Sequence, residues 1–195
     1  MFKQIRKVIE LIIKPFVTVI DIDQLLYGKD TSNVSSRDFE YASSVGPELV
    51  EHMKLPSRGT ECSAGYDFYN NTGKDIVIKP RSRTSGPRFT KVIASGIKVY
   101  MLPDEYLEIV PRSSLGFKYG LSLANTCGVI DADYYGNPKN EGEIFFKLVN
   151  NSKSQIVIKK GEAFAQGIFK KYLTTDTDYE NVGGKREGGI GSTNK

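Results

Sequence analysis

The sequence predicts an all-β protein, a distorted jelly-roll-like β-barrel or sandwich preceded by an N-terminal helical extension. The 195 residues include 11 Tyr and 10 Phe, and aromatic side chains favour the pleated, half-buried surface of a sheet. From about Pro47 onward, short apolar segments alternate with turn residues, which indicates antiparallel strands. No helical segment of crossover length separates two of these segments, so parallel βαβ units are excluded.

Residues 1–47 are predicted to form an N-terminal extension, to which the sequence assigns no role. In residues 1–16, apolar side chains recur three or four positions apart with Lys and Arg between them, which predicts an amphipathic helix. Such a helix packs on the protein's own surface or on a neighbouring subunit, or its basic face suits a membrane surface. The apolar positions are Phe2, Ile5, Val8, Ile9, Ile12, Ile13 and Phe16.

Residues 48–173 are predicted to form the β core, and residues 174–195 a linker and a glycine-rich C-terminal arm. The arm has few apolar residues and is not expected to fold alone. Turn residues such as Pro103-Asp104 and Lys160-Gly161 separate the predicted strands. These strands cover residues 75–79, 91–100, 105–110, 119–123, 143–149, 155–159 and 163–172.

Composition excludes several classes of function. The net charge is +4, and residues 1–20 carry four Lys or Arg against one Glu, so the rest is nearly neutral and disfavours nucleic-acid binding. Cys62, Cys127 and His52 are the only Cys and His residues, which excludes a disulfide framework, a His/Cys metal site and a Ser-His-Asp triad. No apolar run reaches the ~18 residues of a membrane span. Without a recognisable signal peptide, we expect a cytoplasmic, reducing setting.

Two internal segments are unusual for a purely structural sandwich. Arg112, Ser113 and Ser114 follow a predicted strand and place a cation and two hydroxyls at one turn, which suits phosphate oxygens. Asp131 follows two apolar residues, a setting that favours a general base or a water-holding group. The chain must bend after Asp131 if it and Tyr134 are to meet one ligand. Taken singly, these segments are better explained as a Ser-rich surface turn and a turn-forming Asp.

Two later segments also carry polar groups in unusual places. Gln166 lies among apolar neighbours in the last predicted strand, and a buried amide needs partners from the protein or from a ligand. Residues 186–193 combine a cation, glycine-rich backbone and two hydroxyls. This tail is either a flexible terminus or a lid that orders over a polyphosphate.

Five segments in order resemble the five motifs of the trimeric dUTP pyrophosphatases (dUTPases). They are Ala64-Gly65-Tyr66-Asp67-Phe68, PRSSLG at 111–116, N-x-x-GVIDADY at 125–134, GEAFAQGI at 161–168 and REGGIGST at 186–193. The resemblance implies a homotrimer of jelly-roll-like subunits with active sites at subunit interfaces. It also implies hydrolysis of dUTP to dUMP and pyrophosphate with Mg²⁺ bound to the triphosphate. That reaction limits uracil incorporation into DNA and supplies dUMP for thymidylate synthesis.

The resemblance also implies roles for single residues. Asp131 is the general base that orients the attacking water, Tyr134 packs under the deoxyribose, and Asp67 supports the metal through water. The uracil edge is read by Asn125, Gly128, Val129 and Ile130. The phosphates are held by Arg112, Ser113, Ser114, Gly116 and Gln166, and the closing tail contributes Arg186, Gly189, Ile190, Gly191, Ser192 and Thr193.

The chain departs from the family pattern at Tyr135, where Arg or Gln is more common, and at residues 137–142, which lengthen a hairpin. Two other functions stay open. A dCTP deaminase, or a bifunctional deaminase–dUTPase, shares the fold but needs a glutamate at the amino group of the base. A non-catalytic nucleotide-sensing regulator on the same scaffold would not turn over dUTP.

A third departure generates a prediction. Ile190 stands where the family usually has a Phe whose ring stacks on the base, so we expect weaker closure over the substrate. Restoring the ring in Ile190→Phe should lower the KM for dUTP by about two- to tenfold, since aromatic stacking contributes roughly 0.5–1.5 kcal/mol. Steady-state pyrophosphate release measures the change. Unchanged KM and kcat would contradict the idea.

Overall fold

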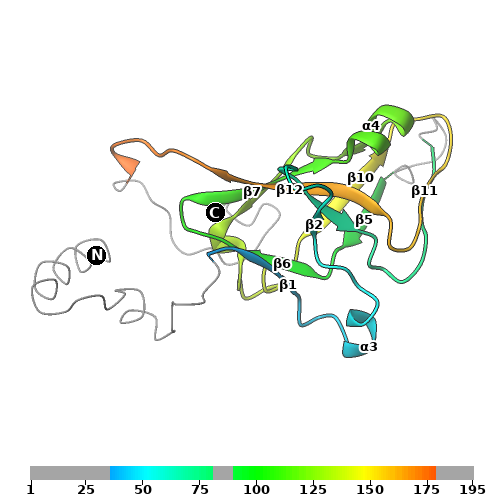
Figure 1. Cartoon of the computed structure of the whole chain (residues 1–195). Helices are drawn as coiled ribbons and strands as arrows, with labels where there is room; N and C mark the ends of the chain where they lie inside the picture. Colours follow the sequence, from blue (N-terminus) through cyan, green and yellow to red (C-terminus); the bar gives the residue numbers. More distant parts are fainter. Residues whose placement is uncertain (1–35, 81–89, 179–195) are drawn as a thin grey trace, which may run out of the picture. The chain divides into compact units, whose positions relative to one another are not determined.

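The computed structural model describes residues 36–80 and 90–178 (Figure 1). Antiparallel strands dominate these residues, which confirms the predicted all-β fold. The predicted amphipathic helix in residues 1–16 and the C-terminal arm with Arg186, Gly189, Ile190, Gly191, Ser192 and Thr193 lie outside the described residues. Within the described ranges, no helix is both long and apolar enough to cross a membrane.

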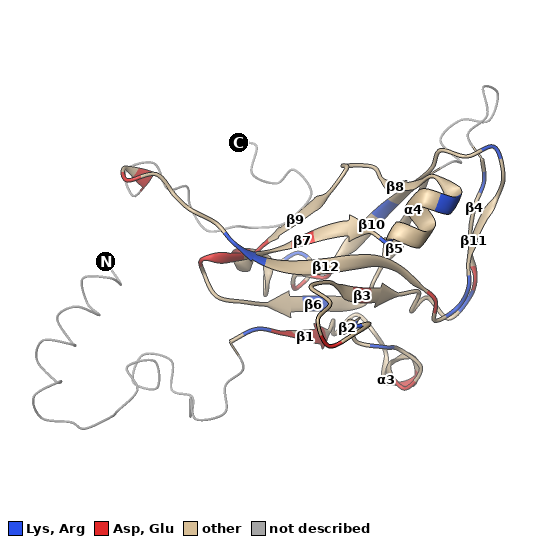
Figure 2. Ribbon diagram, turned by 45° about the horizontal axis from the view of Figure 1, so that its top comes forward, with Lys and Arg blue, Asp and Glu red and all other residues tan. Residues whose placement is uncertain are grey.

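The largest sheet has five strands in the order β2-β3-β12-β7-β9, all paired antiparallel (Figure 2). The long strands β7 and β12 form its centre, and β9 is an edge strand on the β7 side. The bounds are β2 Ser57–Arg58, β3 Tyr66–Tyr69, β7 Glu105–Pro111, β9 Gly128–Asp131 and β12 Ala163–Lys171.

Smaller sheets complete the described fold. A three-stranded sheet has the order β5-β10-β8, and the pairs β1-β6 and β4-β11 are two-stranded. The bounds are β1 Asp38–Tyr41, β4 Ile76–Ile78, β5 Thr90–Ala94, β6 Ile97–Tyr100, β8 Leu121–Leu123, β10 Phe145–Asn150 and β11 Ile156–Ile158. The short helices are α3 Pro47–Val50, α4 Ser113–Tyr119 and the 3-10 turn η3 Ala132–Tyr134.

The core is built from alternate residues of the strands and from a chain of aromatic rings. The Phe68 ring lies 5.7 Å from Phe39 and 5.1 Å from Phe146, and Phe146 lies 4.9 Å from Phe164, all centroid to centroid. These edge-to-face contacts are the favoured geometry for aromatic pairs. Gly167 lets β12 approach this cluster, because a Cβ there would lie 2.9 Å from the Phe68 ring.

Several element predictions need correction. The strand predicted over 91–100 is interrupted at Gly96, whose positive φ of 70° turns the chain between β5 and β6. The turn predicted at 111–116 is the start of α4, which ends at the left-handed Gly120 (φ 65°). The strand predicted over 119–123 therefore begins only at Leu121. Strands β1, β2, β3 and β9 lie outside the predicted strand ranges.

The boundary between the N-terminal extension and the β core also differs from the predicted one. Residues predicted to belong to the extension form β1, which pairs with β6 and buries Phe39 in the core at 6% exposure. Arg37 anchors the start of β1, since its guanidinium binds the Glu105 carboxylate at 2.5 and 2.9 Å. The same interaction lowers the pKa of Glu105 below its ordinary value. The compact β unit thus begins at Arg37 rather than at residue 48.

Candidate active site

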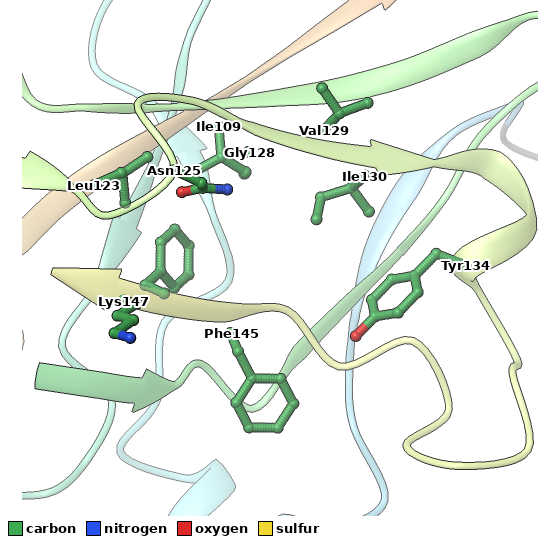
Figure 3. A pocket seen from close by; sticks show the side chains of 10 residues that line it. Ile109, Leu123, Asn125, Gly128, Val129, Ile130, Tyr134, Phe145 and Lys147 are labelled. Carbon is green, nitrogen blue, oxygen red and sulfur yellow. The ribbon is translucent and has the colours of Figure 1, made fainter. Parts of the chain in front are cut away.

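A pocket of about 200 Å³ opens beside β9 (Figure 3). Five residues assigned from the sequence to uracil and deoxyribose line it together: Asn125, Gly128, Val129, Ile130 and Tyr134. The sequence missed the remaining lining residues, which come from β7, β8 and β10: Ile109, Leu123, Phe145, Phe146 and Lys147. The lining is therefore mostly apolar with a few polar groups, as expected of a site for a small organic ligand.

The turn between β8 and β9 forms one wall of this pocket. Thr126 adopts a positive φ of 66°, and the Cys127 N–H donates to the Asn125 carbonyl at 2.7 Å, so the turn is tight. Gly128 lies opposite Ile109 in the sheet. A Cβ at Gly128 would lie 3.1 Å from the Ile109 Cβ and 3.8 Å from Asn125 Nδ2. Glycine thus keeps space free beside the Asn125 amide.

The chain bends directly after β9, as the sequence required for Asp131 and Tyr134 to approach one ligand. β9 ends at Asp131, and η3 carries the chain to Tyr134, which is buried at 6% exposure. Val129 and Ile130 point to opposite sides of β9 (Figure 3). The bend therefore returns the Tyr134 ring to the pocket that Ile130 also lines.

Asp131 is half-buried and lies at the end of β9, opposite Tyr106 of β7. It does not line the 200 Å³ pocket but a second cavity of about 540 Å³. Asp131 therefore follows the pocket residue Ile130 directly in the chain, but the two line separate cavities. Met101, Pro103, Ala132, Asp133 and Tyr172 line the rest of that cavity.

A second group of predicted residues lies where β3, β12 and β7 run side by side. Asp67 of β3 is opposite Gln166 of β12, and Arg112 follows the last residue of β7. Asp67 is 7% exposed, and its Oδ1 lies 3.2 Å from Arg112 Nε. That oxygen accepts no well-aligned hydrogen bond among the described residues. Ser113 and Ser114 are exposed in the first turn of α4, and the half-buried Gly116 follows.

Gly65 belongs to this second group, although the sequence analysis assigns it no role. A Cβ there would lie 2.8 Å from Gln166 Oε1 and 3.2 Å from its Cδ, so any other residue would displace the amide. The signal was available in the Ala-Gly-Tyr-Asp-Phe segment, because an internal glycine beside a strand often marks close approach of another group.

The structure does not bring the two groups together within one chain. Asp131 lies opposite Tyr106, whereas Arg112 lies six residues further along the same strand direction. At about 3.3 Å per residue, this places them about 20 Å apart along β7. Asp131 and Arg112 of one chain are therefore too far apart along β7 to contact the same phosphate group.

The family model for dUTPase matches residues 51–194, which include the pocket and the second group. The chain belongs to the dUTPase family. It is 40% identical over 141 residues to the deoxyuridine 5'-triphosphate nucleotidohydrolase of Lactococcus lactis, covering 72% of this chain and 88% of that protein. It is 33% identical over 156 residues to the protein of that name from Paramecium bursaria Chlorella virus 1, covering 78% and 98%.

Solved structures agree with this assignment. The crystal structure of dUTPase from Streptococcus mutans superposes with a TM-score of 0.58 at 36% identity, covering 71% of this chain and 98% of that one. A dUTPase mutant from phage phi11 of S. aureus, described as coordinating a structural Mg(II) ion, has a TM-score of 0.54 at 18% identity, covering 73% and 94%. At that identity the second likeness supports the fold alone.

Tyr135, at a position where the chain departs from the family pattern, lies in a polar cluster. Its hydroxyl donates to Glu40 Oε2 at 2.7 Å, and its ring lies 5.8 Å from that of Tyr100. Lys98 Nζ lies 5.3 Å from the Tyr135 ring centroid and 3.5 Å from Glu40. Burial, and then the hydrogen bond to the Glu40 carboxylate, raise the pKa of Tyr135 from 10.0 to about 12.

This shift predicts an alkaline loss of stability. Between pH 10 and about 12, Tyr135 loses its proton in the unfolded chain but keeps it in the folded one, so the free energy of unfolding falls as pH rises. Tyr135→Phe removes this contribution and should make the fall shallower, while costing about 1–2 kcal/mol at pH 8 through the lost hydrogen bond. Denaturant unfolding of both proteins from pH 8 to 11.5 measures it. If the free energy of unfolding changed with pH equally in both proteins, the raised pKa would not belong to Tyr135.

Proposed function

We propose that this dUTPase family member hydrolyses dUTP at the α–β phosphoanhydride, giving dUMP and pyrophosphate. The observation that carries the proposal is the pocket, which gathers Asn125, Gly128, Ile130 and Tyr134, while Asp131 directly follows Ile130 at the end of β9. These are the residues that the sequence motif assigns to the base, the sugar and the attacking water. One short segment thus presents groups for all three parts of a nucleotide reaction.

The pocket selects the base and the sugar. The Asn125 amide and the backbone of β9 from Gly128 to Ile130 offer both donors and acceptors to the uracil edge. The tight turn before β9 leaves no room for the methyl group of thymine. The Tyr134 ring packs under the deoxyribose and excludes a 2′-hydroxyl.

Asp131 acts as the general base. Its carboxylate accepts a proton from a water molecule and orients that water toward the α-phosphorus. Phosphoryl transfer needs positioning and neutralisation of charge more than covalent chemistry, so one correctly placed carboxylate suffices on the protein side. Removing such a base typically costs about 10²–10⁴-fold in rate.

The second group holds the triphosphate. Arg112, Ser113, Ser114 and Gln166 supply a cation, hydroxyls and an amide as donors to phosphate oxygens, with Gly116 in the same helix. The buried Asp67 Oδ1, without a well-aligned hydrogen bond, fits an oxygen that accepts from a metal-bound water. Mg²⁺ prefers oxygen ligands and, when bound to the triphosphate, neutralises its charge. The tail residues Arg186, Gly189, Ile190, Gly191, Ser192 and Thr193 close over the terminal phosphates.

The active enzyme is a homotrimer whose sites are shared between subunits. The separation of about 20 Å between Asp131 and Arg112 along β7 supports this arrangement. A second copy of the chain brings its Arg112 group to the pocket of the first. Closed cyclic symmetry then repeats the same contact at every interface.

The activity predicts a specific pattern of turnover. Purified chain with Mg²⁺ should release pyrophosphate from dUTP and at least 100-fold more slowly from dTTP, dCTP and UTP. Asp131→Asn should lower kcat by about 10²–10⁴-fold, because the amide accepts no proton from water. A coupled pyrophosphate assay measures the rates, and an ammonia assay with dCTP detects a deaminase. Equal rates in wild type and Asp131→Asn would contradict the proposed base.

Sharing of the site predicts complementation. Asp131→Asn and Arg112→Met should each be nearly inactive alone. Unfolded together and refolded as a 1:1 mixture, they should regain about a quarter of wild-type activity, because a quarter of the interfaces then unite an intact Asp131 with an intact Arg112. Refolding each variant separately is the control. A mixture no more active than its components would show that both residues serve the same site from one chain.

A further inference from the structure

The hairpin that follows Tyr134 in the chain forms hydrogen bonds with the hydroxyl at the end of its ring. Its hydroxyl donates to the Glu143 carbonyl oxygen at 2.9 Å and accepts from Asn140 Nδ2 at 2.8 Å. Figure 3 shows this hydroxyl directed toward the chain segment that leads into β10. Because buried tyrosine hydroxyls need partners, these contacts fix the tilt of the ring as well as satisfying a polar group.

Asn140 can make these contacts only with its amide intact. Its Nδ2 donates to the Tyr134 hydroxyl and, at 3.1 Å, to the Glu143 carbonyl oxygen. Its Oδ1 accepts from Asn137 Nδ2 at 2.7 Å. If the Asn140 amide were flipped, its oxygen would face the carbonyl oxygen of Glu143, and both are acceptors. The hydrogen-bond network therefore defines one orientation of the Asn140 amide.

Asn137 holds the other end of Tyr134. This side chain is 4% exposed, and its Nδ2 also donates to the Tyr134 carbonyl oxygen at 2.8 Å. Its Oδ1 accepts from the backbone N–H groups of Lys139 and Asn140 at 3.1 and 3.2 Å. Asn137 thus donates to the backbone carbonyl of Tyr134, and Asn140 donates to its hydroxyl.

The hairpin is also held by hydrogen bonds that do not involve the Asn140 amide. The Gly136 N–H donates to the Glu141 carbonyl at 2.9 Å, and the Glu141 N–H donates to the Asn137 carbonyl at 2.9 Å. The Ser43 hydroxyl donates to the Glu141 carboxylate from outside the hairpin. The donors of Asn140 therefore act mainly on Tyr134 and on the carbonyl beside it.

We propose that Asn140, supported by Asn137, is a positioning residue that sets the preference for deoxyribose over ribose. The inference rests on the proposed function, in which the Tyr134 ring excludes a 2′-hydroxyl. Exclusion of one oxygen depends on ring placement to within about 1 Å. Without the Asn140 donors, the Tyr134 ring can move away from the sugar, so that the 2′-hydroxyl of ribose fits. The contacts to the base are kept.

The test compares two asparagines whose Nδ2 groups donate to the same two kinds of acceptor. Asn151 Nδ2 also donates to one backbone carbonyl, that of Gly120 at 3.1 Å, and to one hydroxyl, that of Ser122 at 2.9 Å, away from the pocket. Asn140→Leu and Asn151→Leu remove equivalent donors. Calorimetric titration with dUDP and with UDP gives the ratio of the two Kd values, and steady-state kinetics gives kcat and KM for dUTP and UTP.

Asn140→Leu should reduce the preference for dUDP over UDP by about three- to tenfold, the size of one lost hydrogen bond, and Asn151→Leu should leave it unchanged. In a Tyr134→Phe background, Asn140→Leu should have little further effect, since the hydroxyl it acts on is gone. If Leu at 140 prevents folding, Asn140→Asp keeps the acceptor for Asn137 while losing both donors, and the same direction is expected.

A folded Asn140 variant with an unchanged ratio of Kd values would overturn the inference. An equal loss of preference for dUDP in Asn151→Leu would also overturn it, as would an undiminished effect of Asn140→Leu in the Tyr134→Phe background. Failure of the proposed function looks different. A wild-type chain that prefers dUDP but releases no pyrophosphate from dUTP overturns the hydrolase, and the Kd ratios still decide the role of Asn140. A wild-type chain that binds neither nucleotide overturns both.

Discussion

The register of β7 is the constraint on which both parts of the candidate site depend. β7 pairs with β9 on one side, where Tyr106 lies opposite Asp131, and with β12 on the other, where Val110 lies opposite Gln166. Leu107 of β7 is fully buried, so a slip by one residue would turn the apolar face outward. The pairing that buries the core therefore also fixes the proposed general base and a proposed phosphate ligand at set positions along one strand.

The sequence predicted those site residues that are neighbours in the chain. Asn125, Gly128 and Tyr134 belong to one short segment, and the fold brings them to one pocket. The apolar wall could not be predicted, because residues such as Ile109 and Phe145 come from strands distant in sequence. In an alternating strand, only the tertiary packing decides which face lines a pocket and which joins the core.

The incorrect predictions of helices and strands also have local causes. The segment 111–116 is predicted as a turn, because the seven residues of α4 are too few to show helical periodicity. The helix is instead defined by its ends, an extended Arg112 and a left-handed Gly120. β1 was missed because four residues give almost no periodic signal, and its place in the fold comes from pairing with β6 and from burial of Phe39.

The hairpin that holds Tyr134 is itself tied to the start of the β unit. Glu143 is 7% exposed, and a buried carboxylate is costly unless hydrogen bonds replace its hydration. Its Oε1 accepts from the Gly96 N–H at 2.9 Å and its Oε2 from the Ser44 hydroxyl at 3.2 Å. Ser44 precedes the region matched by the family model. The hairpin that holds Tyr134 is thus fixed partly from a segment before the family match, so the proposed selection of the sugar depends on that segment too.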